Sequence, residues 1–133
     1  MVLGTADADG RPWTTPVWYA RESYEELFWV SKPGARHSRN IADRPQVSIV
    51  VFDSQVPVVS AAAIYMEAVA EELAGAELER GLDVFGRESA AQRLSVWTLA
   101  DVTGDARHRL YCATVTEHWV LDPRDERVPV TLA

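Results

Sequence analysis

The chain has 133 residues, a formal net charge of −7 at pH 7, 47% hydrophobic residues and 25% charged residues. This length fits one domain, 1–133, that can bury a core, and the composition is typical of a globular protein. The acidic balance argues against general nucleic-acid binding, which needs a broad basic face, and against docking on an anionic membrane. No run of about 18 apolar residues is present, so we expect no membrane span. The single cysteine, Cys112, cannot form an internal disulfide and indicates a reducing, cytoplasmic setting.

The N-terminal segment predicts a β-hairpin. Asp9-Gly10 is a strong turn signal between two β-prone runs, and the second run extends from Trp13 to Tyr19. Pro16 interrupts this second run and has no N–H for a central ladder, so we expect an edge strand or a bulge there. Residues 27–31, LFWVS, then predict a short apolar third strand.

The middle of the chain predicts a short helix and two further strands. ARHSRNIAD, 35–43, can form about two helical turns, which Pro45 ends. Residues 46–53 predict a buried strand and residues 54–61 a loop. Residues 62–73 alternate between two faces, which favours a strand, although a helix of this length also fits.

A second helix is predicted after these strands. Residues 75–89 place Leu78, Leu82 and Phe85 at i, i+4 and i+7. This apolar stripe is narrow, and Gly81 weakens the helix.

One long strand, 109–122, is the last predicted element, and Thr98–Asp101 before it resembles either a helix start or an irregular connection. One face of this strand is expected to carry Tyr111, Ala113, Val115, Trp119 and Leu121, and the other Cys112, Thr114, Thr116 and His118. Six strands with hairpin connections predict a mainly β fold, a closed or split antiparallel barrel that removes exposed edges.

Motifs of several common enzymes are absent. The sequence has no G-x-G-x-x-G before a helix, no Walker loop, no H-E-x-x-H, no C-x-x-C and no G-x-S-x-G. His37, His108 and His118 have no paired-ligand spacing, so no metal site is predicted. The first residues lack a secretory signal but already resemble a strand interior, which leaves open that residues upstream of Met1 are missing.

A basic turn stands out in this acidic chain. Lys32, Arg36 and His37 follow the strand end at Ser31 and surround a predicted helix start, where free backbone N–H groups favour an anion. Arg36 offers a planar fork, Lys32 a point charge and Ser38 a hydroxyl donor to phosphate oxygens. A solvated turn whose cations balance nearby acids fits these residues equally well.

The stretch from Leu3 to Phe52 resembles the pyridoxamine 5′-phosphate oxidase-like superfamily, whose members are FMN-binding split barrels. GTADADGRPWTTPVW is similar to the family's first hairpin, and KPGARHSRNIADRP followed by QVSIVVF is similar to its turn, helix and next strand. RLYCATVTEHWVLD is similar to the last strand, while 54–107 match loosely. The resemblance covers nearly the whole chain and implies a six-stranded split β-barrel.

The resemblance implies a homodimer that holds FMN at the subunit interface. Residues that match the family's phosphate-binding turn are Lys32, Arg36, His37 and Ser38. Residues that match the segment under the isoalloxazine ring are Thr14, Thr15, Pro16, Val17 and Trp18, and Val30 and Ser31 are expected near the cofactor. The resemblance therefore favours a phosphate site at the basic turn.

Some branches of this superfamily use a deazaflavin coenzyme instead and often carry lysine at the position of His37, so the resemblance favours FMN. The chain is shorter than a true pyridoxine or pyridoxamine phosphate oxidase and has fewer matching basic residues near its C-terminus. This difference argues against vitamin B6 chemistry.

Three functions remain open at this point. The first is an FMN-dependent oxidoreductase or flavin reductase that acts on a small organic substrate with a nicotinamide reductant. The second is a deazaflavin-dependent reductase of the same fold. The third is a non-catalytic flavin or haem binder, in which His37, His108 or His118 would ligate the iron. Trp97, in the least regular segment, is the tryptophan expected to form a cavity wall.

Overall fold

The computed structural model describes residues 1–132, which form eight strands, two α-helices and two short 3₁₀ turns. The strands are β1 (Val2–Ala6), β2 (Pro12–Pro16), β3 (Ala20–Arg21), β4 (Glu26–Ser31), β5 (Gln46–Phe52), β6 (Ala63–Glu72), β7 (Arg109–Leu121) and β8 (Arg127–Val130). The helices are α1 (Arg36–Asp43) and α2 (Gly75–Ala91), and the 3₁₀ turns are η1 (Val58–Ser60) and η2 (Leu99–Asp101). Within the described residues, no helix is long and apolar enough to cross a membrane.

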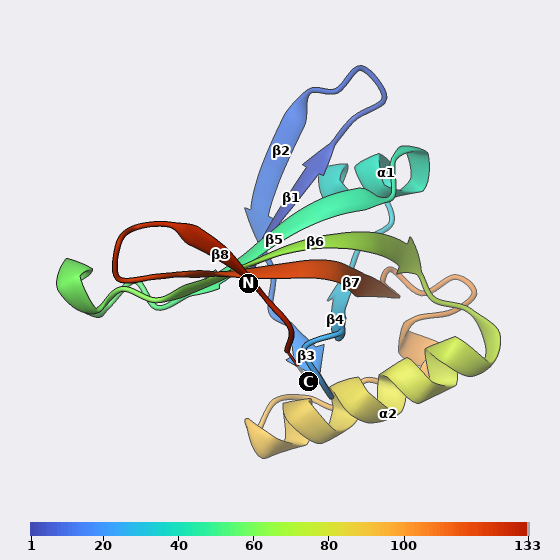
Figure 1. The fold of residues 1–133 in the computed structure, drawn as a ribbon. Coiled ribbons are helices and arrows are strands. Elements are labelled where there is room, and N and C mark those ends of the chain that lie inside the picture. The colour runs from blue at the N-terminus through green and yellow to red at the C-terminus, as the bar shows by residue number, and fades with distance from the viewer. Residues whose placement is uncertain (133) are drawn as a thin grey trace.

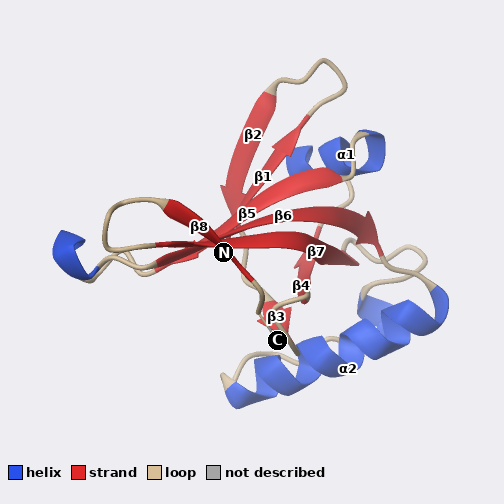
Figure 2. Cartoon of the chain, in the orientation of Figure 1, coloured by secondary structure: helices blue, strands red, loops and turns tan. Residues whose placement is uncertain are grey.

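The strands form one antiparallel sheet in the order β2-β1-β5-β6-β7-β4-β3, and β8 pairs with the C-terminal half of β7. Figure 1 shows this sheet curled into a half-barrel, with α1 near one end and α2 along the side of β3 and β4. Figure 2 shows how little of the chain is helical. This arrangement confirms the predicted mainly β split barrel and places β2, with Pro16, at a sheet edge as expected.

The number of strands predicted, six, is too low. Residues 20–21 form the two-residue strand β3, and Arg127–Val130 form β8 after a tight turn. The predicted second strand, which was expected to reach Tyr19, ends at Pro16, because proline cannot continue the ladder. Residues 63–72 form a strand rather than a helix, as the alternation of their side chains predicted.

The predicted faces of β7 are wrong beyond Thr116. The register between β6 and β7 shifts at this residue, so that Met66 pairs with His118 and Tyr65 pairs with Trp119. A bulge adds one residue to one strand and so reverses the alternation of the side chains that follow. His118 therefore shares the inner face with buried Met66, and Trp119 lies on the outer face.

Strand β4 and residues 110–113 of β7 are buried on both faces, which explains the nearly continuous apolar sequence of each. Leu27 and Trp29 of β4 belong to a cluster inside the half-barrel, whereas Phe28 belongs to a second cluster beneath α2. The second cluster consists of Ala20, Phe28, Leu73, Leu78, Val84, Phe85, Val102, Leu110 and Cys112. Burial raises the pKa of the Cys112 thiol to about 12, so this cysteine is an inert core residue, as expected.

Gly81 is a packing position, which the sequence pattern did not indicate. A Cβ atom at Gly81 would lie 2.8 Å from Leu73 Cδ1 and 3.0 Å from Leu110 Cδ2. The missing side chain therefore lets α2 approach the sheet closely.

Thr98–Asp101 forms a helix start, which was one of the two predicted alternatives for this stretch. Thr98 and Asp101 make a capping box at the 3₁₀ turn η2.

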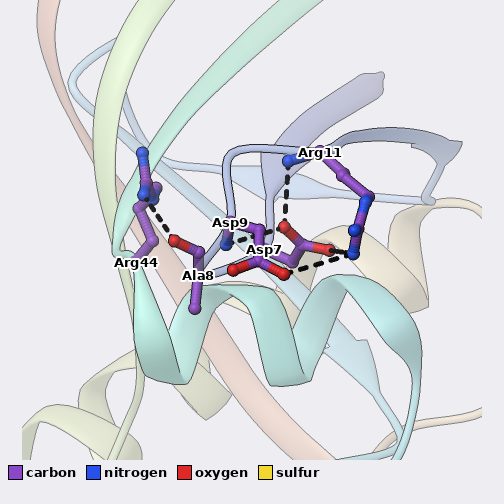
Figure 3. A network of polar contacts seen from close by, with 5 residues as sticks. All are labelled: Asp7, Ala8, Asp9, Arg11 and Arg44. Atoms are coloured by element: carbon purple, nitrogen blue, oxygen red, sulfur yellow. Dashed lines mark hydrogen bonds and ion pairs between the residues drawn. The ribbon is translucent and has the colours of Figure 1, made fainter.

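The tip of the β1–β2 hairpin is fixed by polar contacts to its own backbone and to the end of α1 (Figure 3). Asp7 Oδ1 accepts hydrogen bonds from the backbone N–H groups of Arg11 (2.9 Å) and Asp9 (3.0 Å). The Arg11 N–H contributes most to holding the pKa of the Asp7 carboxyl below its usual value. Arg44, just after α1, donates to the carbonyl oxygen of Ala8 at 3.1 Å. These contacts place the hairpin against α1.

Candidate functional site

Helix α1 closes one end of the half-barrel with a largely polar face. Asn40 Nδ2 donates to Thr5 Oγ1 of β1 at 2.9 Å, and His37 Nε2 lies 2.8 Å from Ser31 Oγ of β4. Ile41 is the residue of α1 that enters the apolar core. The helix thus docks through hydrogen bonds to two strands, which fixes where His37 lies.

A cavity of about 490 Å³ opens beside this helix. It is lined by Pro16, Val17, Trp18, Val30, Ser31, His37, Phe85, Ser89, Leu94, Ser95 and Trp97. Three separate segments of the chain form one wall of this cavity: the end of β2 with the loop after it, the end of β4, and α1. The C-terminal half of α2 and the segment after it form the opposite wall.

Six of the eleven residues proposed for a cofactor site line this cavity: Pro16, Val17, Trp18, Val30, Ser31 and His37. Thr14 and Thr15 do not line it, and Thr14 instead lines a groove on the outer face of the sheet. Lys32 and Arg36 are exposed and lie next in sequence to the lining residues Ser31 and His37. The Arg36 guanidinium lies 4.6 Å from the centre of the Trp13 ring.

Ser38 lies outside the 490 Å³ cavity. It is 3% exposed, its Oγ has no hydrogen-bond partner of normal geometry, and it lines a separate cavity of about 400 Å³ with Tyr111 and Glu72. Burial raises the pKa of the Tyr111 hydroxyl, and the nearby Ser38 hydroxyl only partly opposes this effect. A helical step of about 100° separates neighbouring residues, so His37 and Ser38 face different cavities.

The charge of His37 depends on its burial. The residue is only 9% exposed, and burial lowers the pKa of its imidazole below the usual 6.5. The side chain is therefore neutral at pH 7 and is not the cation that the basic turn suggested. The remaining lining residues carry no ionisable group, so the cavity is uncharged at this pH.

A sequence model of the family described as pyridoxamine 5′-phosphate oxidase matches residues 1–120 of the chain. The chain belongs to this family. No match is found among curated proteins.

Solved structures of this family's fold resemble the chain at low sequence identity. A haem-binding protein from Mycobacterium smegmatis is 20% identical, with a TM-score of 0.75, over 98% of this chain and 51% of its own. HutZ, a haem storage protein from Vibrio cholerae, is 21% identical, with a TM-score of 0.68, over 90% of this chain and 83% of its own. An F420 reductase is 18% identical, with a TM-score of 0.62, over 88% of this chain and 86% of its own. The chain thus spans about half of the first of these proteins.

The sequence did not indicate that α2 forms a wall of the cavity. Phe85 and Ser89 come from this helix, and Leu94 and Ser95 from the segment after it. Trp18 links the two sides, because its ring meets Phe85 edge-to-face at 4.9 Å between ring centres and its Nε1 donates to Gln92 at 3.2 Å. Apolar residues on a helix look the same in sequence whether they line a core or a cavity.

Other residues considered for chemistry lie away from the cavity or already have partners. His118 Nε2 lies 2.7 Å from the Tyr24 carbonyl oxygen, and Tyr111 stacks on Trp29 in the core. His108 meets Trp97, a cavity wall as expected, at 5.1 Å between ring centres. Residues 1–132 contain no group of three or more histidine, cysteine, aspartate or glutamate side chains placed to hold a metal ion.

The outer face of the sheet forms a second surface of interest. Two grooves of about 420 and 480 Å³ share Gly4, Thr14, Ser48 and Glu67 and so make one continuous depression. The outward positions of β1, β2 and β5 carry no charged side chain, although the outer face of a sheet usually carries polar residues. A Cβ atom at Gly4 would meet Ser48 Oγ, so Gly4 and Ser48 lie in close contact across the groove.

Proposed function

We propose that this chain binds flavin mononucleotide (FMN) and works as an oxidoreductase or flavin reductase on a small organic substrate. The observation that carries this proposal is that Pro16–Trp18, Val30–Ser31 and His37, three segments matched to the family's cofactor site, line one cavity. The cavity volume of about 490 Å³ lies within the range of roughly 300–1,000 Å³ that is usual for small-molecule sites.

The chemistry of the cavity fits the two parts of FMN. Its uncharged walls, with Trp18, Phe85 and Trp97, suit a planar aromatic ring. Lys32 and Arg36 lie outside the cavity but adjoin it in sequence, and they suit a phosphate together with the N-terminus of α1, whose first turn has no acidic residue. Within this proposal, the basic turn holds the anionic group and the cavity holds the ring.

The flavin would supply the hydride or electron transfer, and the chain would position it, shield it from water and orient the substrate. His37 is the one ionisable residue that lines the cavity, and its Nε2 already lies 2.8 Å from Ser31 Oγ, so we assign no side chain as an acid or base. A nicotinamide is the reductant we propose, because this cofactor commonly delivers hydride to flavins.

We further propose that the chain forms a homodimer through the outer sheet face. The uncharged outward positions of β1, β2 and β5 suit burial, and Glu67 and Arg127 line the same groove. In a two-fold interface Glu67 of one copy can meet Arg127 of the other copy, and the symmetry repeats this contact. The groove lies next to the cavity, since Val2 in the groove is the cross-strand neighbour of Pro16 in the cavity wall.

Replacing Ser48 with arginine is expected to convert this dimer into a folded monomer. The substitution puts a charge in the centre of the proposed interface, and Ser48 is exposed in the single chain, so folding is spared. Light scattering gives the mass, and circular dichroism checks the fold. A wild-type monomer that binds its cofactor would contradict the proposed dimer.

Haem binding is the second candidate, and His37 is the observation that favours it. A neutral imidazole in an apolar cavity is a suitable iron ligand. The similar structures of haem-binding proteins are consistent with this candidate, and the similar F420 reductase supports a deazaflavin coenzyme as an alternative to FMN.

A visible spectrum of the purified protein, followed by titration with FMN, separates these candidates. Flavin bands or saturable quenching of FMN fluorescence support the proposal, and a Soret band points to haem. Replacing Arg36 with alanine is expected to weaken FMN binding by up to about tenfold, since an exposed charged contact contributes about 1.4 kcal/mol or less.

Riboflavin, which lacks the phosphate, is the matched control for the Arg36 variant. Its affinity is expected to stay the same in Arg36→Ala and in the wild type. An unchanged FMN affinity in this variant would remove Arg36 from the proposed phosphate site.

A further inference from the structure

The separate cavity of about 400 Å³ beside α1 is a candidate for a second ligand site. Its walls come from α1, from the end of β6 and from β7, and they include Ser38, Glu72 and Tyr111. We propose that this cavity binds a small primary amine, whose ammonium group contacts these three side chains. None of them lines the 490 Å³ cavity, so the second site is independent of the flavin proposed above.

The side chain that points to a ligand is Ser38. The residue is only 3% exposed, and its Oγ has no hydrogen-bond partner of normal geometry among residues 1–132. A buried hydroxyl normally has a partner, because an unpaired one costs free energy. A helical serine often donates to the carbonyl oxygen four residues earlier, as Ser89 does to Phe85, but Ser38 makes no such bond. The Ser38 hydroxyl therefore remains available to a group in the cavity.

Two further oxygen-bearing side chains lie at the same end of this cavity. Glu72 of β6 and Tyr111 of β7 are cross-strand neighbours, so their side chains leave the sheet on the same face. Burial raises the pKa of the Tyr111 hydroxyl most, the Ser38 hydroxyl opposes this rise, and the Glu72 carboxylate adds to it. Ser38 and Glu72 thus both lie beside the Tyr111 hydroxyl, and two hydroxyls and one carboxylate converge.

The charges around these oxygens favour a cation over an anion. Glu71 and Glu72 both line the cavity and carry negative charge. Glu72 meets Arg109 Nε at 3.4 Å, but the other nitrogens of this guanidinium donate to backbone carbonyl oxygens. Arg39, the cation among the lining residues, donates to the carbonyl oxygen of Gly34. Both arginines are therefore already engaged, and an anion would meet the Glu72 carboxylate.

A primary ammonium group matches the three oxygen-bearing side chains in number and in charge. It has three N–H donors and no acceptor, as the end of a lysine side chain does. Ser38 Oγ, the Tyr111 hydroxyl oxygen and the Glu72 carboxylate can each accept one of these hydrogen bonds. Buried Ile41 and Ala70 line the rest of the cavity and suit a short alkyl chain.

NMR titration of the ¹⁵N-labelled protein with butylammonium chloride, without added FMN, tests this site. We expect saturable shifts of the Ser38 and Tyr111 amide signals, with a dissociation constant in the millimolar range. 1-Butanol lacks the charge and butyltrimethylammonium lacks the N–H donors, so each is expected to bind at least about tenfold more weakly. Equal binding of butyrate would overturn the preference for a cation. The same shifts with magnesium chloride would assign the oxygens to a metal ion and overturn the amine.

Ser38→Ala separates a ligand-binding serine from a structural one. The variant loses a buried oxygen that has no partner, so we expect a higher unfolding temperature of the free protein together with about tenfold weaker butylammonium binding. A lower unfolding temperature with unchanged binding would overturn the assignment of Ser38.

Glu72→Gln is expected to weaken butylammonium binding by about three- to tenfold, since it removes the carboxylate from a partly exposed contact. Glu79→Gln is the matched control, because it removes the same charge from α2, where Glu79 lines a different cavity. Equal losses of affinity in both variants would show a general effect of net charge and overturn the site. Wild-type protein that shows no saturable shifts with butylammonium would overturn it too, whereas the FMN titration tests the proposed function separately.

Discussion

Replacing Trp29 with alanine is expected to lower the free energy of unfolding by about 3–5 kcal/mol. Trp29 is fully buried inside the half-barrel, and its ring stacks on Tyr111 at 5.7 Å between ring centres. The variant loses this contact and leaves a cavity that the rigid strands β4 and β7 cannot close. Denaturant unfolding, followed by the near-ultraviolet signal of the remaining aromatic residues, measures the loss.

Two control variants sharpen this prediction. Trp13→Ala removes a ring that is 40% exposed, so we expect a loss below about 1 kcal/mol. Trp29→Phe keeps an aromatic ring and removes an Nε1 that has no hydrogen-bond partner, so we expect a loss clearly smaller than that of Trp29→Ala. Equal losses in Trp13→Ala and Trp29→Ala would contradict the assignment of Trp29 to the core.

The same substitution at two glycines of α2 is expected to have opposite effects. Gly81→Ala puts a methyl group 2.8 Å from Leu73 Cδ1 and 3.2 Å from Phe28 Cδ1, and overpacking of this kind costs about 1–3 kcal/mol. Alanine is the better helix former by about 1 kcal/mol, but the contacts surround the new methyl group from the sheet side, so packing dominates.

Gly86→Ala is the matched control. The nearest atom to its new methyl group is Val96 Cγ1 at 3.8 Å, an ordinary contact, so the gain in helix propensity of about 0.5–1 kcal/mol remains. Thermal unfolding of both variants gives the comparison. A stabilised Gly81→Ala protein would show that α2 can move away from the sheet without cost.

Local signals in the sequence predicted most of the elements. Asp9-Gly10 located the first hairpin, and Pro45 located the end of α1. Strands β3 and β8 were missed because they have only two and four residues, and each depends on pairing with its neighbour in the chain, β4 for β3 and β7 for β8. The faces of β7 beyond Thr116 were wrong because a bulge depends on the partner strand, which the alternation along one strand does not show.

The cavity was only partly predictable for a related reason. Family resemblance brought Pro16–Trp18, Val30–Ser31 and His37 together, and the structure places them in one cavity. The charge of His37 could not be read from its basic neighbours, because burial by α1 and β4 sets its pKa. The residues proposed for the phosphate turn also divide, since Ser38 faces the Tyr111 side of α1.

The pairing of β4 with β7 has a consequence for the synthesis of the chain. Trp29 pairs with Tyr111, so the apolar strand β4, whose other neighbour is the two-residue strand β3, can pair with β7 only after about 80 further residues are made. At about 5–20 residues per second, this delay on the ribosome is of the order of 4–16 s. During that time β4 exposes Leu27, Phe28 and Trp29, a short apolar segment of the kind that chaperones and aggregation both act on. The half-barrel can close only after β7 has emerged, because β7 joins β6 to β4.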